Sequence, residues 1–126
     1  MARVLVVEDN DANMTLASFL LESVGHTVLK ATDAETGVAM AGAEQPDLIL
    51  MDIQLPGMDG LRATAILKAD PATRSIPIYA LTALAMKGDE ERILAAGCDG
   101  YIAKPLAYKE FLATIAAELG KGAPAP

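Results

Sequence analysis

Five short apolar segments recur along the chain at nearly even spacing, and this pattern constrains the fold more than any other feature. They cover residues 4–7, 26–30, 48–51, 76–81 and 100–103, so that their starts lie 22 to 28 residues apart. That spacing is typical of units in which a strand, a helix and the next parallel strand follow one another. Near-continuous Val, Ile and Leu predict that most of these strands are covered on both faces. The segment 26–30 mixes polar and apolar residues, which favours an edge strand.

Between these segments the apolar residues recur at a helical period. The clearest examples are residues 14–24 and 111–119, where one face is apolar and predicts an amphipathic helix. Asp33 and Asp59 are placed to cap the second and third helices. Three glycines are placed to end the first, fourth and fifth helices: Gly25, Gly97 and Gly120.

Five such units predict an α/β fold, a three-layer (βα)5 sandwich around a doubly wound, five-stranded parallel sheet. Right-handed crossovers favour the strand order 2-1-3-4-5, the flavodoxin-like arrangement. The length of 126 residues suits one domain, which we place at residues 1–120. Residues 121–126 are rich in Gly, Pro and Ala, and we expect them to form a flexible C-terminal tail.

Composition excludes several classes of protein. Ten basic against seventeen acidic residues give a net charge of −7, which disfavours nucleic-acid binding because phosphate backbones are repelled. No apolar run approaches the roughly 18 residues that a membrane helix needs. The lone cysteine, Cys98, forms no internal disulfide, and no leader opens the chain, so we expect a cytoplasmic protein.

Polar residues follow four of the five predicted strands at the point where each strand ends. Glu8 and Asp9 follow the first strand, Asp52 the third, Thr82 the fourth and Lys104 the fifth. Because the carboxyl ends of parallel strands meet at one edge of the sheet, where ligands bind in such folds, we expect these side chains to cluster. Each alone has a simpler interpretation as a helix cap, a turn former or a solvated side chain.

Together these residues form a chemically sensible set. Clustered carboxylates repel one another unless a hard cation joins them, and Mg²⁺ prefers one or two carboxylates with water and phosphate oxygens. Asp9 and Asp52 are candidates for direct ligands, and Glu8 for a ligand through water. Asp52 has a second oxygen free to attack phosphorus. Lys104 and Thr82 are placed to stabilise the phosphate oxygens.

Three further residues are open to more than one interpretation. His26, the only histidine, lies at the start of the second strand, away from this edge, and a structural or surface role is favoured. Cys98 is interpreted as a packed residue and not a nucleophile. The Lys104–Pro105 bond is either a cis peptide that directs the lysine inward or a trans proline that opens the last helix.

Four motifs in this order resemble the receiver domain of bacterial two-component response regulators. They are VLVVEDN at 4–10, DLILMDIQLPGMDG at 47–60, ALTA at 80–83 and YIAKP at 101–105. The resemblance covers residues 3 to about 119. It implies that Asp52 accepts a phosphoryl group, that Glu8 and Asp9 are the acidic metal pair, and that the backbone carbonyl of Gln54 is a further ligand of Mg²⁺.

The same resemblance implies a conformational switch. Thr82 and Lys104 would contact the phosphoryl group, Pro105 would shape the loop that follows the last strand, and Tyr101 would turn inward when Thr82 moves. The output surface would comprise the fourth helix, at about 86–96, the last strand and the start of the last helix. Its candidate contact residues are Leu84, Met86, Tyr101 and Tyr108, which are alternatively core residues.

The function implied is that of a phosphoacceptor in a histidine–aspartate relay. A histidine kinase or a histidine phosphotransferase would phosphorylate Asp52, and the altered surface would regulate a downstream protein. Residues 83–93 and 97–105 further resemble single-domain cell-cycle regulators of alphaproteobacteria. No DNA-binding output domain, no membrane association and a monomer or weak dimer are expected. The protein would catalyse only its own phosphorylation and slow dephosphorylation, and so would not be a turnover enzyme.

Three alternative functions can each be distinguished from the phosphoacceptor by one feature of the sequence. A phosphatase of the haloacid dehalogenase type also uses a nucleophilic aspartate, but it needs a second acid two residues later, where this chain has Gln54. A flavodoxin-type cofactor binder needs a phosphate loop, whereas Glu8 and Asp9 would repel phosphate. A phosphorylation-independent adaptor would be recognised by the loss of site residues, and this chain retains them.

Overall fold

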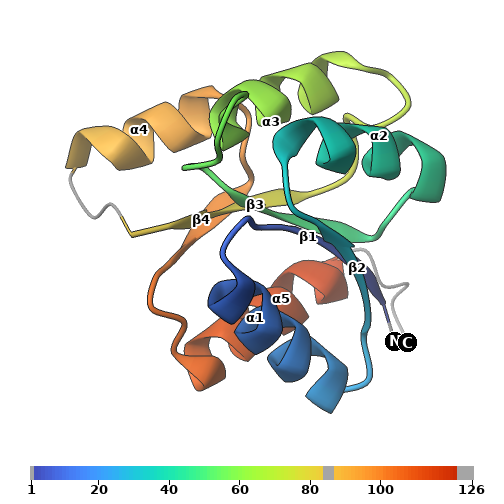
Figure 1. The fold of residues 1–126 in the computed structure, drawn as a ribbon, viewed down its shortest axis with the longest axis vertical. Coiled ribbons are helices and arrows are strands. Elements are labelled where there is room, and N and C mark those ends of the chain that lie inside the picture. Colours follow the sequence, from blue (N-terminus) through green and yellow to red (C-terminus); the bar gives the residue numbers. More distant parts are fainter. Residues whose placement is uncertain (1, 84–86, 122–126) are drawn as a thin grey trace.

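Strands and helices alternate along the computed structural model, which describes residues 2–83 and 87–121 (Figure 1). The order of elements confirms the predicted (βα)5 pattern. The strand β4 begins two residues later than expected, because the Ile76 amide instead closes a turn onto the Thr73 carbonyl. The elements are β1 (Arg3–Val7), α1 (Asp11–Ser23), β2 (Thr27–Ala31), α2 (Ala34–Glu44), β3 (Leu48–Asp52), α3 (Gly60–Ala69), β4 (Ile78–Thr82), α4 (Lys87–Ala95), β5 (Gly100–Ala103) and α5 (Tyr108–Lys121).

The five strands form one sheet in the order β2-β1-β3-β4-β5, and every neighbouring pair is parallel. This confirms the predicted topology. The strands β3 and β4 are buried along their whole length, as expected for central strands covered on both faces. In β2 only Ala31 is fully buried, in agreement with its predicted position at the edge.

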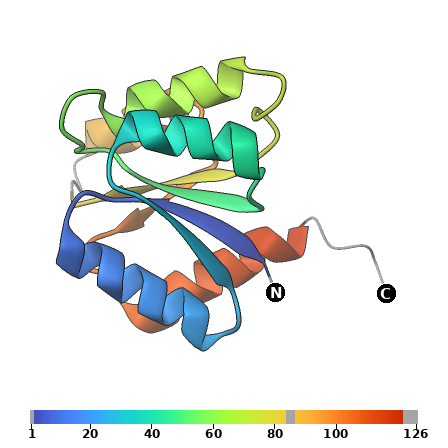
Figure 2. The same ribbon diagram turned by 45° about the vertical axis from the view of Figure 1, so that its right-hand side comes forward.

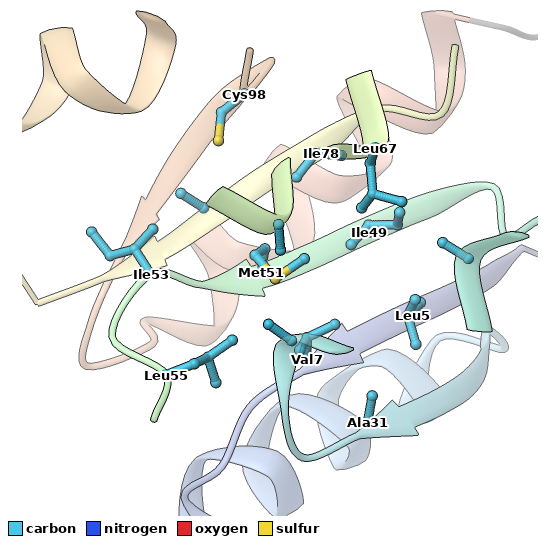
Figure 3. Close-up of a cluster of buried hydrophobic side chains, with 14 of the residues drawn as sticks. Leu5, Val7, Ala31, Ile49, Met51, Ile53, Leu55, Leu67, Ile78 and Cys98 are labelled. Atoms are coloured by element: carbon cyan, nitrogen blue, oxygen red, sulfur yellow. The ribbon is translucent and has the colours of Figure 1, made fainter. Parts of the chain in front are cut away.

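Helices cover both faces of the sheet, so the molecule has three layers (Figures 1 and 2). The helices α2, α3 and α4 lie on one face, and their apolar residues pack with Val7, Ile49 and Met51 (Figure 3). The helices α1 and α5 lie on the other face, where Leu21 and Phe111 pack against the alternate residues of the same strands. Side chains alternate between the two faces along a strand. The packing of the apolar residues therefore fixes the face of the sheet on which each polar residue at a strand end lies.

The predicted N-terminal caps of two helices are confirmed. Asp33 accepts a hydrogen bond from the Thr36 amide at 2.7 Å, and Asp59 accepts one from the Arg62 amide at 2.8 Å. Each carboxylate satisfies an amide that has no partner within its helix. The Asp59 cap fixes the start of α3, which lies directly behind the end of β3.

The glycines predicted to end helices differ in outcome. Gly25 and Gly97 follow α1 and α4 with positive φ angles of 92° and 107°, which confirms them as helix ends. The prediction for Gly120 is wrong, because α5 continues through it to Lys121. Glycine lowers helix propensity by only about 1 kcal/mol, and Leu119 packs against the core at this point. Residues 122–126 of the predicted tail lie outside the described residues.

Among residues 2–83 and 87–121, no helix combines the length and the apolar character that crossing a membrane requires.

Candidate functional site

The polar residues that end the strands converge at one edge of the sheet, as predicted. Glu8 follows β1, Asp52 and Thr82 are the last residues of β3 and β4, and Lys104 follows β5. All four strands run in the same direction, so their carboxyl ends meet here.

Three carboxylates form a compact cluster at this edge. Glu8, Asp9 and Asp52 each offer an oxygen, and these oxygens lie within 4.8 Å of one another. Glu8 and Asp52 are buried, being 1% and 3% exposed, whereas Asp9 is exposed and open to solvent. A set of hard oxygen donors without histidine or cysteine suits Mg²⁺, which keeps several waters and needs few protein ligands. The residues present therefore fit a small divalent cation.

Among the described residues, Lys104 contacts two of these acids. Its ammonium nitrogen lies 2.8 Å from Oε1 of Glu8 and 3.2 Å from Oδ2 of Asp52. The Lys104–Pro105 peptide bond is cis, which resolves the alternative left open by the sequence, and Pro105 itself is exposed. Lys104 follows the edge strand β5, and its side chain thus bridges the ends of β1 and β3.

The protonation of this group reflects burial and charge together. Burial raises the pKa of the Glu8 carboxyl above its usual value, and Asp52 adds to the rise, while Lys104 and the Asn10 amide oppose it. Burial lowers the pKa of Lys104, but the contacts with Glu8 and Asp52 outweigh it and hold that pKa above its usual value. The lysine is therefore charged at neutral pH.

Backbone amides orient both buried carboxylates. The Gln54 amide donates to Oδ1 of Asp52 at 2.9 Å, and the Asn10 amide donates to Oε2 of Glu8 at 3.2 Å. Asn10 also caps α1, since its side chain accepts from the Asn13 amide at 2.9 Å. Asn10 was not among the predicted site residues, although an asparagine just before a predicted helix is a recognisable capping signal.

Thr82 and Tyr101 lie near this edge on the adjacent strands β4 and β5. Thr82 pairs with Ala103, and Ala80 pairs with Tyr101, so the threonine and the tyrosine occupy the same face of the sheet. Thr82 is only 2% exposed, whereas Tyr101 is 42% exposed. The structure thus places the two residues on one face, with a buried threonine and an open tyrosine.

The structure places the remaining predicted residues in different parts of the molecule. Tyr108 begins α5 and is exposed; Leu84 and Met86 lie outside the described residues. His26 is away from the site, and its Nδ1 accepts a hydrogen bond from the Ala2 amide. Cys98 is buried against Thr64, and burial raises the pKa of its thiol, which opposes nucleophilic chemistry.

Comparison with known proteins identifies the family. Residues 4–116 match the model of the response regulator receiver domain. The chain belongs to this family. It is 47% identical to the polar-differentiation response regulator DivK of Brucella anthropi over 117 residues, which cover 93% of this chain and 95% of that protein. DivK of Brucella ovis is similar to the same extent. This receiver domain is therefore DivK-like along most of its length.

Solved receiver domains share the fold. The receiver domain of the sensor histidine kinase PA1611 from Pseudomonas aeruginosa aligns with a TM-score of 0.88 and 39% identity, covering 94% of this chain and 98% of that one. That structure holds a magnesium ion in its active-site cleft. The chemotaxis protein CheY4 of Vibrio cholerae aligns with a TM-score of 0.88 and 26% identity, covering 93% of this chain and 98% of that one.

Proposed function

We propose that this receiver domain is a phosphoacceptor switch in which Asp52 takes a phosphoryl group from a phosphohistidine. The observation that carries the proposal is the buried group of Glu8, Asp52 and Lys104 at the carboxyl edge of the sheet. One Asp52 oxygen is held by the Gln54 amide. The other faces Lys104 and is the candidate nucleophile, which would form a new O–P bond as the P–N bond to the donor imidazole breaks.

Lys104 and Thr82 would stabilise the transferring group. Phosphoryl transfer concentrates charge on the equatorial oxygens, so catalysis rests mainly on positioning and electrostatics. Lys104 is already charged and poised at Asp52. Thr82 ends the neighbouring strand, and its hydroxyl would donate to a phosphate oxygen.

Mg²⁺ is the proposed cofactor. Asp9, Asp52 and the Gln54 backbone carbonyl would be direct ligands, and Glu8 would hold a ligand water. The metal would supply neutralising charge for the phosphate oxygens and an orienting template. The compact acidic cluster supports this assignment, as does the magnesium ion in the PA1611 receiver domain.

The proposed donor is a histidine kinase or a histidine phosphotransferase. The helix α1 begins with Asp11, two residues after Asp9, and exposes Leu16 and Phe19. These two side chains help to line a shallow hollow on α1, together with Asp11. An exposed apolar surface on the helix that follows Glu8 and Asp9 is a suitable docking place for the donor protein.

The proposed output is a change in the surface formed by α4, β5 and the start of α5. Phosphorylation adds roughly −1.5 to −2 charge at Asp52, which would draw the Thr82 side chain toward the phosphoryl group and let Tyr101 turn inward. The exposed Tyr101 and Tyr108 then belong to the surface that a downstream protein reads, together with the predicted Leu84 and Met86. The net charge of −7 supports a protein target and disfavours nucleic acid.

We further infer that the domain works in the cytoplasm as a monomer or weak dimer. Its buried, unpaired Cys98 suits a reducing compartment. The protein would change only its own phosphorylation state and would not turn over a separate substrate.

The proposal is tested by intact mass spectrometry after incubation with acetyl phosphate and Mg²⁺. The wild-type protein should gain about 80 Da, the mass of one phosphoryl group. Asp52→Asn and metal-free wild-type protein should gain nothing. Asp47→Asn, which changes an exposed acid at the opposite end of the same strand, should gain the full mass.

A gain in Asp52→Asn equal to that of the wild type would contradict the assignment of the acceptor. No gain in any sample calls for a purified phosphorylated histidine phosphotransferase as donor. Failure with that donor as well, in folded protein, would favour the phosphorylation-independent adaptor.

A further inference from the structure

The first residue of α3, Gly60, packs directly against the backbone of Asp52. A Cβ atom on Gly60 would lie 2.1 Å from the carbonyl oxygen of Asp52 and 2.8 Å from Cα of Ile53. Both are backbone atoms, which cannot rotate away as the end of a side chain can. Any larger residue at this buried position would therefore displace either the start of α3 or the end of β3.

This contact closes the loop that carries the proposed metal ligand. The Gly60 amide donates to the Ile53 carbonyl at 3.4 Å, so the loop that leaves β3 returns to it. Within that loop, the Gln54 amide holds Oδ1 of Asp52 at 2.9 Å. The orientation of the Asp52 carboxylate and the place of Gln54 thus depend on how closely α3 approaches β3.

The first turn of α3 is stiffened from within by one hydrogen bond and is contacted on its other side by Cys98. The Thr64 hydroxyl donates to the Gly60 carbonyl at 2.8 Å, and Thr64 is fully buried. The Thr64 oxygen lies 3.8 Å from Sγ of Cys98, in the connection between α4 and β5. A larger residue at position 60 therefore meets the acceptor strand on one side, while α3 itself packs on the connection between α4 and β5 through Thr64.

We propose that Gly60 is a positioning residue for the chemistry of Asp52, because its missing side chain sets the depth at which the acceptor strand ends beside Glu8 and Asp9. This inference rests on the proposed function. Mg²⁺ requires nearly ideal octahedral geometry, and a displacement of about 1 Å of a reacting group can cost about 100-fold in rate. Substitution at this position should thus affect metal binding and phosphorylation beyond any effect on folding.

The test compares Gly60→Ala with a variant of the same helix that leaves the site untouched. Leu67→Ala removes a buried side chain far along α3 and lowers stability without contact with Asp52. Circular dichroism is first used to find a temperature at which both variants are folded. The Mg²⁺ dissociation constant is then measured by amide NMR titration, and the phosphorylation rate is measured with acetyl phosphate at saturating Mg²⁺.

Gly60→Ala should bind Mg²⁺ about 10-fold more weakly and accept phosphate about 10- to 100-fold more slowly. Leu67→Ala should keep wild-type values for both. Gly42→Ala, at a helical glycine with open space around it, should also keep them. A folded Gly60→Ala with wild-type metal affinity and rate would overturn the inference, as would an equal loss in Leu67→Ala.

A second variant covers the case in which Gly60→Ala does not fold. Thr64→Val keeps the side-chain volume and removes only the hydroxyl that holds the Gly60 carbonyl. Metal affinity about threefold to 10-fold weaker would support the inference, and wild-type affinity and rate would overturn it. Failure of the wild-type protein itself to be phosphorylated counts against the proposed function. A loss of metal affinity or phosphorylation rate in the variants alone supports the role of Gly60.

Discussion

The ammonium nitrogen of Lys104 lies 3.2 Å from the carboxylate of Asp52, and both side chains are largely buried, being 17% and 5% exposed. The same nitrogen contacts Glu8 at 2.8 Å. One cation therefore balances two buried acids, and an incoming phosphoryl group would meet a positive charge already in place. Removing a partner from such a group is costly because a buried charge is left without compensation.

Lys104→Met should lower the free energy of unfolding by about 3–5 kcal/mol in the absence of divalent cations. Saturating Mg²⁺ should recover part of this loss, since a metal at the acidic cluster replaces the missing positive charge. Urea unfolding followed by circular dichroism, with and without Mg²⁺, measures both effects. Lys109→Met, at an exposed position of α5, is the control and should change stability little. Equal losses in the two variants would contradict the role of Lys104.

Asp9→Asn should abolish the stabilisation that Mg²⁺ provides while leaving the metal-free protein intact. A ligand present at 100 times its dissociation constant stabilises a folded protein by about 2.7 kcal/mol, and we expect a gain of this order in the wild type. Asp9 is exposed, so its replacement has little direct cost, and it removes repulsion within the cluster. Thermal unfolding in Mg²⁺ and in EDTA makes the comparison. Asp11→Asn, two residues further along, should retain the stabilisation by Mg²⁺. Loss of this stabilisation in Asp11→Asn would show that the effect of Asp9→Asn is a nonspecific effect of charge.

The strand order and the convergence of the polar residues could be predicted because both follow from local pattern and general topology. Glu8, Asp52 and Lys104 each end a strand or follow one directly, and parallel strands bring such residues to one edge. Prediction of the fold thus required only the spacing of the apolar segments and the handedness of the crossovers.

The rest depends on packing that no local pattern reveals. Gly60 follows a capping aspartate and has the sequence context of an ordinary helix start, whereas its close approach to Asp52 arises only when α3 docks on β3. Gly120 has the sequence context of a helix end, but α5 extends one residue past it, because the helix-propensity penalty of glycine is small. The bridging of two acids by Lys104 depends on side-chain conformations at three strand ends.

Tyr101→Ala should separate phosphorylation from its structural response. Tyr101 is 42% exposed on the edge strand, so we expect the unfolding midpoint to change little and the phosphorylation of Asp52 to stay within about twofold of wild type. The amide shifts that phosphorylation induces in α4 should shrink, because the residue proposed to turn inward when Thr82 moves is gone. NMR spectra of both proteins, with and without acetyl phosphate, report this difference. Unchanged shifts in α4 would remove Tyr101 from the switch.

Tyr79 provides a test of stability at alkaline pH. Its hydroxyl donates to Oε1 of Glu118 at 2.7 Å. Burial, aided by the nearby Glu118 carboxylate, raises the pKa of Tyr79 from 10.0 to about 12. As the pH rises through about 10, the unfolded chain releases this proton while the folded protein retains it. Ionisation therefore favours the unfolded state, and stability should fall between about pH 10 and pH 12.

Tyr79→Phe separates this contribution from that of the lysines, which titrate in the same range. The variant loses the hydrogen bond to Glu118, so it should be less stable than wild type at neutral pH, and its stability should fall less steeply above pH 10. Urea unfolding across this range gives the two slopes, and ultraviolet absorbance follows the appearance of tyrosinate. The wild type should show a late-titrating tyrosine that is missing from the variant. Parallel stability curves for the two proteins would mean that Tyr79 ionises without cost to the fold, and that the contact with Glu118 does not hold its proton.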